Sequence, residues 1–250
     1  MASRKEEKER LRQQRLAAER RAASSGQRRL MLGYVVAGVL AAAVVVGIVV
    51  VIASGSGGGG GGEDVDAPEN AHVDPTSGST NGVELDAREG TPPPAVQQAR
   101  LDQAAKDAGC DLQLGLRDEG NDHLSGNEEP PRYGTSPPTS GDHDPTPQAD
   151  GAYAATPEPR NFVHSLEHGR IEIQYSPDLP EEDQLALKGV FDEDPNGMLM
   201  FPNPDMPYEV AATAWTNLLG CKKYDGPATL DAIRAFRDTL RGQGPEPIPL

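Results

Sequence analysis

One uninterrupted apolar segment, residues 30–53, constrains this 250-residue chain more than any other feature. Its 24 residues include no charged side chain. At about 1.5 Å of rise per residue, a helix of this length reaches about 36 Å, more than the roughly 30 Å of a hydrocarbon core. In lipid, a single segment satisfies its own backbone hydrogen bonds only as a helix. The sequence therefore predicts one transmembrane helix over 30–53, with membrane lipid as its partner.

The charges of the chain are distributed unequally on the two sides of this segment. Residues 1–29 hold ten basic and four acidic residues, a net charge of +6, whereas residues 54–250 hold 13 basic and 35 acidic residues, a net charge of −22. Lys and Arg mark the cytoplasmic flank of membrane helices. We therefore expect a single-pass protein with a basic cytoplasmic tail at 1–29 and an extracytoplasmic C-terminal part. The acidic surplus also disfavours nucleic acid, whose phosphates it would repel.

A cleaved signal peptide is the alternative interpretation of the apolar segment. The apolar region of a signal peptide is normally about 7–15 residues long and follows a short basic stretch. Here the apolar run is longer and 29 residues precede it. The sequence therefore favours an uncleaved signal anchor.

Composition divides the rest of the chain into a linker and one folded domain. Seven glycines and one serine occupy positions 55–62, and the polar, acidic residues that follow contain no aromatic side chain up to position 90. Such a composition is typical of a flexible tether, and we expect a disordered linker over 54–90. Outside the apolar segment, every aromatic residue lies between Tyr133 and Phe236. Residues 91–250 should therefore form the extracytoplasmic domain with the packed core.

Hydrophobic periodicity within this domain predicts both helices and strands. Helical patterns cover residues 94–108, 180–191 and 227–241, and strand patterns cover residues 112–116, 171–175, 198–201 and 208–216. In the strand at 171–175, Glu172 and Gln174 alternate with apolar residues, which predicts one face in water. Eight prolines over 117–160 predict a long ordered loop. These elements indicate an α+β fold, a small mixed sheet with packed helices, preceded by the transmembrane helix and the Gly-rich linker.

Cys110 and Cys221 are the only two cysteines, and both follow the apolar segment on the side that we expect to be oxidising. One structural disulfide between them is the simplest interpretation. The alternative, a redox-active pair, lacks the CxxC spacing and the surrounding basic cluster that favour a low thiol pKa.

Histidines make a metal site the most specific functional hypothesis. His164 and His168 lie four positions apart, a spacing that places both on one face of a helix, and His143 lies in a Pro-rich loop. Neutral imidazole is a common metal ligand. A methionine sulfur would favour copper, whereas three imidazoles and a water would favour zinc. We therefore predict a site that binds copper or zinc, copper slightly preferred, with three core ligands and two additional candidates: His143, His164, His168, His123 and Met206.

Two other interpretations of these histidines stay open. They can hydrogen-bond a polar ligand or stabilise the long loop in a domain without a metal. Residues 164–168 also match the H-x-x-E-H motif of inverzincin proteases, in which Glu167 would be the base and the two histidines zinc ligands. That motif needs a substantial helix, and the prolines upstream with Gly169 downstream leave room for at most nine helical residues. The sequence therefore favours a non-enzymatic site.

Two motifs in the domain are specific: PPTSG at 137–141, followed by His143, and HSLEHG at 164–169. They are accompanied by GAY at 151–153, PDM at 204–206 and ATAW at 212–215. Together, over roughly residues 95–247, these motifs resemble the bacterial family called domain of unknown function 3105. The resemblance implies a membrane anchor before an extracytoplasmic domain, and it implies no activity. One departure is Asp142, where the family pattern has proline.

Overall fold

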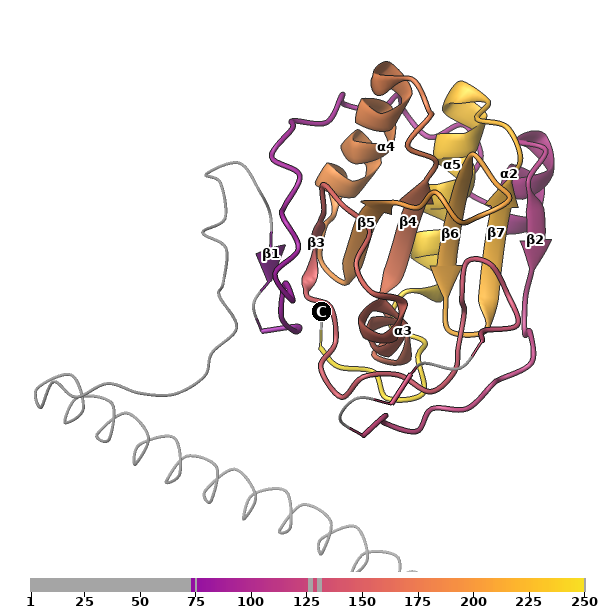
Figure 1. The fold of residues 1–250 in the computed structure, drawn as a ribbon. Helices are drawn as coiled ribbons and strands as arrows, with labels where there is room; N and C mark the ends of the chain where they lie inside the picture. Colours follow the sequence, from indigo (N-terminus) through magenta and orange to yellow (C-terminus); the bar gives the residue numbers. More distant parts are fainter. Residues whose placement is uncertain (1–72, 75, 126–127, 130–131, 250) are drawn as a thin grey trace, which may run out of the picture. The chain divides into compact units, whose positions relative to one another are not determined.

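A computed structural model of the chain describes residues 73–74, 76–125, 128–129 and 132–249 (Figure 1). These residues all lie within one compact unit, Gly61–Leu250. The predicted cytoplasmic tail at 1–29, the transmembrane helix at 30–53 and the Gly-rich run of the linker lie outside the described residues. Within the described part, none of the helices combines the length and the apolar character that crossing a membrane requires.

A seven-stranded mixed sheet organises the domain, with the strand order β1-β3-β5-β4-β6-β7-β2. The strands β3, β5 and β4 are parallel neighbours, and the other neighbours are antiparallel. The predicted α+β class with a mixed sheet is confirmed. The strands are β1 Val73–Asp74, β2 Asp111–Gln113, β3 Asp150–Ala152, β4 Ile171–Tyr175, β5 Met198–Pro202, β6 Val210–Ala214 and β7 Asn217–Cys221.

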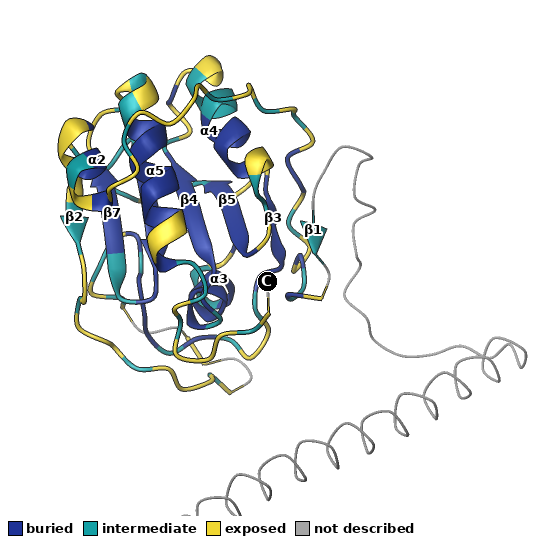
Figure 2. Cartoon of the chain, turned by 180° about the vertical axis from the view of Figure 1, so that it is seen from behind, coloured by how far each residue is buried: buried dark blue, intermediate teal, exposed yellow. Residues whose placement is uncertain are grey.

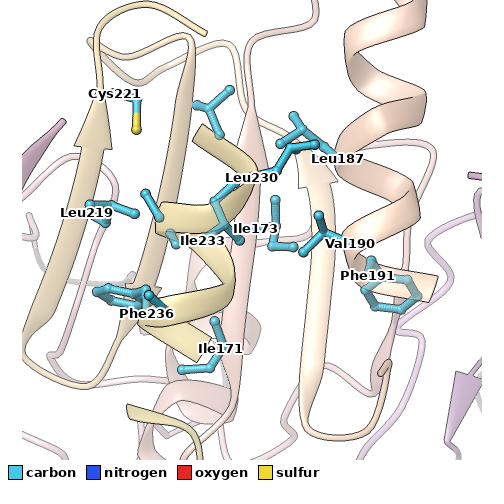
Figure 3. Packing of buried hydrophobic residues seen from close by; sticks show 14 of the residues in the cluster. Ile171, Ile173, Leu187, Val190, Phe191, Leu219, Cys221, Leu230, Ile233 and Phe236 are labelled. Carbon is cyan, nitrogen blue, oxygen red and sulfur yellow. The ribbon is translucent and has the colours of Figure 1, made fainter. Parts of the chain in front are cut away.

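Helices cover both faces of this sheet (Figures 1 and 2). On one face, apolar side chains of three helices form one cluster with Ile171 and Ile173 of β4, and Figure 3 shows the part of it that α4 and α5 contribute. On the other face, Phe162 and Leu166 of the remaining helix pack on Phe201 of β5. The first face carries α2 Leu101–Asp107, α4 Glu181–Glu193 and α5 Gly226–Leu240, and the second carries α3 Pro159–Glu167.

The prediction that one face of β4 is in water is wrong. Glu172 and Gln174 are fully buried, because α3 and the long loop supply a second layer that local periodicity does not reveal. Their side chains form a polar network in which Gln174 Nε2 and Thr213 Oγ1 both donate to Glu172 Oε2, at 2.8 and 2.7 Å, and Asn203 Nδ2 donates to Gln174 Oε1. Glu172 Oε1 has no partner. Burial raises the pKa of Glu172 well above its usual value.

The first predicted helix begins seven residues later than expected, at Leu101. The backbone N–H groups of Gln97 and Gln98 donate to Asp231 Oδ2 on α5, at 2.8 and 2.9 Å. This tertiary contact engages the backbone of the segment after the prolines, which stays outside the helix, and Arg100, the residue before the helix, has an extended backbone. The helices predicted around 180–191 and over 227–241, and the strands at 171–175 and 198–201, agree with the structure within a few residues.

Residues 76–90 form part of the domain, although we expected a flexible linker over 54–90. Leu85 is only 4 % exposed and belongs to the apolar cluster on the α3 face. The backbone N–H of Asp86 donates to Ala152 O at 2.9 Å, and that of Gly90 donates to Asp192 Oδ2 at 2.9 Å. A few specific contacts therefore anchor a segment whose average composition is that of a linker.

The predicted disulfide is confirmed. Cys110 and Cys221 are bonded, with their Cα atoms 4.2 Å apart and 111 positions apart in sequence. The bond joins the segment between α2 and β2 to the end of β7. It therefore closes a loop that includes most of the sheet.

Candidate metal centre

Four side chains from α3 and the long loop converge on one point: His123, His143, His164 and Glu167. The ligand atoms that they offer all lie within 4.8 Å of one another. His164 and Glu167 are three positions apart on α3, a spacing that places both on one side of the helix. Within the long loop, the part that carries His143 runs beside the part that carries His123. Two backbone hydrogen bonds join these parts: His143 N donates to Asp122 O, and Leu124 N donates to His143 O. This cluster could hold a metal ion.

Backbone carbonyls orient two of the imidazoles. His143 Nδ1 lies 2.8 Å from Gly141 O, and His164 Nδ1 lies 2.7 Å from Asp144 O. Because a carbonyl oxygen only accepts hydrogen bonds, each Nδ1 carries the hydrogen and donates. In the neutral ring, the lone pair is then on Nε2. Histidines that bind metals are commonly held in this way, with the other ring nitrogen bonded to a carbonyl or carboxylate.

A buried contact between His143 and Glu167 needs a positive charge or a proton. His143 Nε2 lies 3.1 Å from Glu167 Oε2, and both side chains are at most 1 % exposed. With its hydrogen on Nδ1, a neutral His143 would direct a lone pair at an ionised carboxylate, and two acceptors do not attract each other. A proton or a metal cation between the two atoms removes this conflict. Asn121 Nδ2 holds the other carboxylate oxygen, at 2.9 Å.

The buried position of His164 favours the neutral form of its ring. Burial lowers its pKa to about 4, the neighbouring histidines add to this effect, and the hydrogen bond to Asp144 O opposes it. The ring is therefore uncharged at neutral pH, the form that binds metals. Its Nε2 atom lies 4.0 Å from Glu167 Oε2.

The other predicted ligands have different positions. His123 is exposed, and its ring centroid lies 5.2 Å from that of His143 and 4.8 Å from that of His164. His168 is the C-cap of α3, outside the cluster of four, with its ring centroid 4.5 Å from that of His164. Met206 precedes β6, which begins at Val210. Trp215 follows the opposite end of β6, and its ring centroid lies 6.3 Å from that of His143. Met206 and the cluster are therefore at opposite ends of this strand.

Glu167 is the member of the cluster that the sequence analysis did not include among the metal ligands. It entered there only as the base of the H-x-x-E-H alternative. The available signal was its spacing of three positions from His164, in a segment that has room for at most nine helical residues. The structure also shows why the protease motif is a poor description: α3 has nine residues and ends at Glu167, and the carboxylate lies against His143.

The fold and the site define a class of protein: an α+β domain with a mixed sheet and a largely buried His/Glu cluster beside a short helix. Residues 125–248 match the sequence model of a family described as "Protein of unknown function (DUF3105)". This part of the chain therefore belongs to that family, as its motifs indicated, and it includes His143, His164 and Glu167. Comparisons with curated proteins and with solved structures gave no match.

Proposed function

We propose that the domain binds one transition-metal ion, Zn²⁺ or Cu²⁺, through His143, His164, Glu167 and His123. The observation that carries this proposal is the buried contact between His143 Nε2 and Glu167 Oε2, which needs a cation or a proton between its atoms. A metal ion would satisfy this contact and the lone pair of His164 at the same time. The carbonyl-bonded Nδ1 atoms support the proposal, because they direct Nε2 of both rings away from the backbone.

The donor set favours some metals over others. Three imidazole nitrogens and one carboxylate oxygen suit Zn²⁺ or Cu²⁺, whereas Cu⁺ prefers sulfur. Because Glu167 takes the place that the sequence analysis gave to Met206, zinc replaces copper as the first candidate. In a tetrahedral zinc site, neighbouring donor atoms lie about 3.4 Å apart. The pair His143–Glu167 already meets this spacing, and the exposed His123 is the ligand best placed to move inward.

The proposed role is metal binding, delivery or sensing rather than catalysis. Structural zinc sites have four protein ligands, whereas catalytic sites leave one position for water or substrate. The four ligands proposed here would fill a tetrahedral shell. A second candidate is a metal-free domain in which the cluster shares a proton and supports the long loop. The hydrogen bonds from His143 and His164 to loop carbonyls are compatible with that alternative as well, because they tie both rings to the loop whether or not a metal is bound.

Metal titration of the full chain separates these two candidates. The chain is purified in detergent, treated with a chelator and titrated with Zn²⁺ and with Cu²⁺ by calorimetry. We expect one ion per chain, and His143→Ala or Glu167→Gln should weaken binding more than about a hundredfold, because even groups that only support a ligand contribute about 10–100-fold. Met206→Leu is the control and should bind normally. Absence of binding, or unchanged binding in both cluster variants, would favour the metal-free domain.

The proposed location of this site is outside the cytoplasmic membrane, on a single-pass anchor at 30–53. The charge asymmetry about that segment supports this topology, and the disulfide supports it because disulfides persist in oxidising compartments. Protease added to intact cells should therefore remove an epitope placed at the C-terminus. An epitope that stays protected until the cells are lysed would contradict this location.

A further inference from the structure

His168 is an imidazole beside the cluster that the proposed ligand set leaves unused. It caps α3 one position after Glu167, and it is half-buried whereas His143 and His164 are buried. Ring centroids are 4.5 Å apart for His168 and His164, and 4.6 Å apart for His164 and His143. The three imidazoles therefore form a row that leads from the surface to the buried contact with Glu167.

The end of the chain holds His168 in place. Residues 242–249, here called the C-terminal strap, pass beside the end of α3 (yellow in Figure 1). His168 Nδ1 lies 2.9 Å from Glu246 O, and Glu246 N donates to Glu167 O at 3.1 Å. The nearly inaccessible guanidinium of Arg170 donates to the backbone carbonyls of Ile248 and Pro249. The strap is thus fixed to the same turn that carries His168.

This contact gives His168 the same hydrogen-bonding state as the two buried histidines. Glu246 O can only accept, so His168 Nδ1 donates and the lone pair of the neutral ring is on Nε2. The row therefore consists of three imidazoles whose free nitrogens are all of the kind that binds metals.

We propose that His168 is an exchange ligand, through which the metal ion enters and leaves the cluster. This inference rests on the proposed function. An ion enclosed by four protein ligands can leave only if bonds to those ligands break, and each break is easier when a new ligand lies nearby, as the ring of His168 lies beside that of His164. A bond to His168 Nε2 would form as the bond to a more deeply buried ligand breaks, with no change in oxidation state. The ion would then pass to an acceptor that offers nitrogen or sulfur ligands.

The test compares rates with affinities. The full chain loaded with Zn²⁺ is mixed with an excess of the chromogenic chelator pyridylazoresorcinol, and the transfer of zinc is followed by absorbance. For His168→Ala we expect zinc transfer to be at least about tenfold slower, which corresponds to about 1.4 kcal/mol in the barrier. The equilibrium affinity should stay within about threefold of wild type, because an exchange ligand lowers the barrier for binding and for release alike. His168→Glu should recover part of the rate, because a carboxylate also binds zinc.

Matched variants keep the outcomes distinct. Glu246→Ala retains the backbone carbonyl that orients His168 and should transfer zinc at the wild-type rate, whereas His123→Ala removes a resident ligand and should weaken binding. An unchanged transfer rate in His168→Ala would overturn the inference. A large loss of affinity in that variant would also overturn it, because His168 would then be a resident ligand. Failure of the wild-type chain to bind zinc or copper would instead refute the proposed function, and this inference with it.

Discussion

Single carbonyl oxygens decide the chemistry of this site at the residue scale. An isolated histidine has two tautomers, and nothing in the amino-acid sequence indicates which nitrogen keeps its hydrogen. Gly141 O and Asp144 O each select the Nδ1–H form of one ring, so that both Nε2 atoms can face Glu167. The cluster therefore depends on loop backbone far from α3 in sequence, since Asp144 lies 20 positions before His164.

The buried Glu172 gives a prediction about pH at the same scale. Its pKa in the folded domain lies above its usual value of 4.5, so above that pH the unfolded chain ionises while the folded domain retains the proton. Unfolding then releases a proton, and the folded state loses about 1.4 kcal/mol per pH unit until the folded-state pKa is reached. We expect Glu172→Gln to be more stable than wild type at pH 7, with the difference vanishing near pH 4.

Urea denaturation of both proteins between pH 4 and 8 checks this expectation, where the free energy of unfolding is the measured quantity. Glu182→Gln, at an exposed position on α4, is the matched control and should differ from wild type by a small amount over the whole range. A stability difference for Glu172→Gln that stays constant with pH would show that Glu172 is ionised in the folded domain.

At the element scale, the short α3 and the C-terminal strap act as one unit. Gly244 lies so close to the end of α3 that a Cβ atom there would be 2.0 Å from Glu167 O and 2.5 Å from Gly169 N. Both of these atoms belong to the backbone and cannot rotate away. The absence of a side chain at position 244 is therefore what allows the strap to reach His168.

Gly244→Ala should consequently separate the strap from α3. We expect a loss of about 1–3 kcal/mol in the free energy of unfolding, the usual cost of forcing extra atoms into a packed site, and weaker metal binding because Glu167 shifts with its backbone. Thermal unfolding and zinc titration measure the two effects. Glu246→Ala, which alters an exposed strap side chain, should change neither. Wild-type stability in Gly244→Ala would mean that the strap is not held in this position.

At the scale of the whole molecule, the disulfide constrains the fold most directly. Cys110 lies just before the edge strand β2, and Cys221 ends β7, which pairs with it. A bond that closes a loop of 111 positions limits the freedom of the unfolded chain over most of the domain. The chain-entropy description assigns up to about 5 kcal/mol to such a loop.

The double variant Cys110→Ala and Cys221→Ala should lose stability by up to about 5 kcal/mol. Urea denaturation gives this value, and wild type measured with a reducing agent should approach the variant. The variant itself should not respond to the reducing agent. Equal stabilities of the oxidised wild type and the double variant would show that the bond contributes little, whatever its role in the folded state.

Features that depend on residues close together in the sequence could be predicted without the tertiary structure. The α+β class, the helices near Pro180 and Pro227, the strand β5 and the pairing of the two cysteines follow from periodicity, helix-starting residues and cysteine count. Each of these signals is local or admits a single solution. The motifs around His143 and His164 likewise identified the family.

Contacts between segments that are distant in sequence decided the features that the sequence did not predict. The burial of Glu172, the late start of α2 and the packing of residues 76–90 each depend on a partner far away in sequence. The presence of Glu167 in the candidate site in place of Met206 also depends on such contacts. Its side chains come together because the long loop packs against α3, and the spacing of residues along the sequence does not contain that information. Only the folded chain brings the free nitrogens of the long loop and of α3 to one carboxylate.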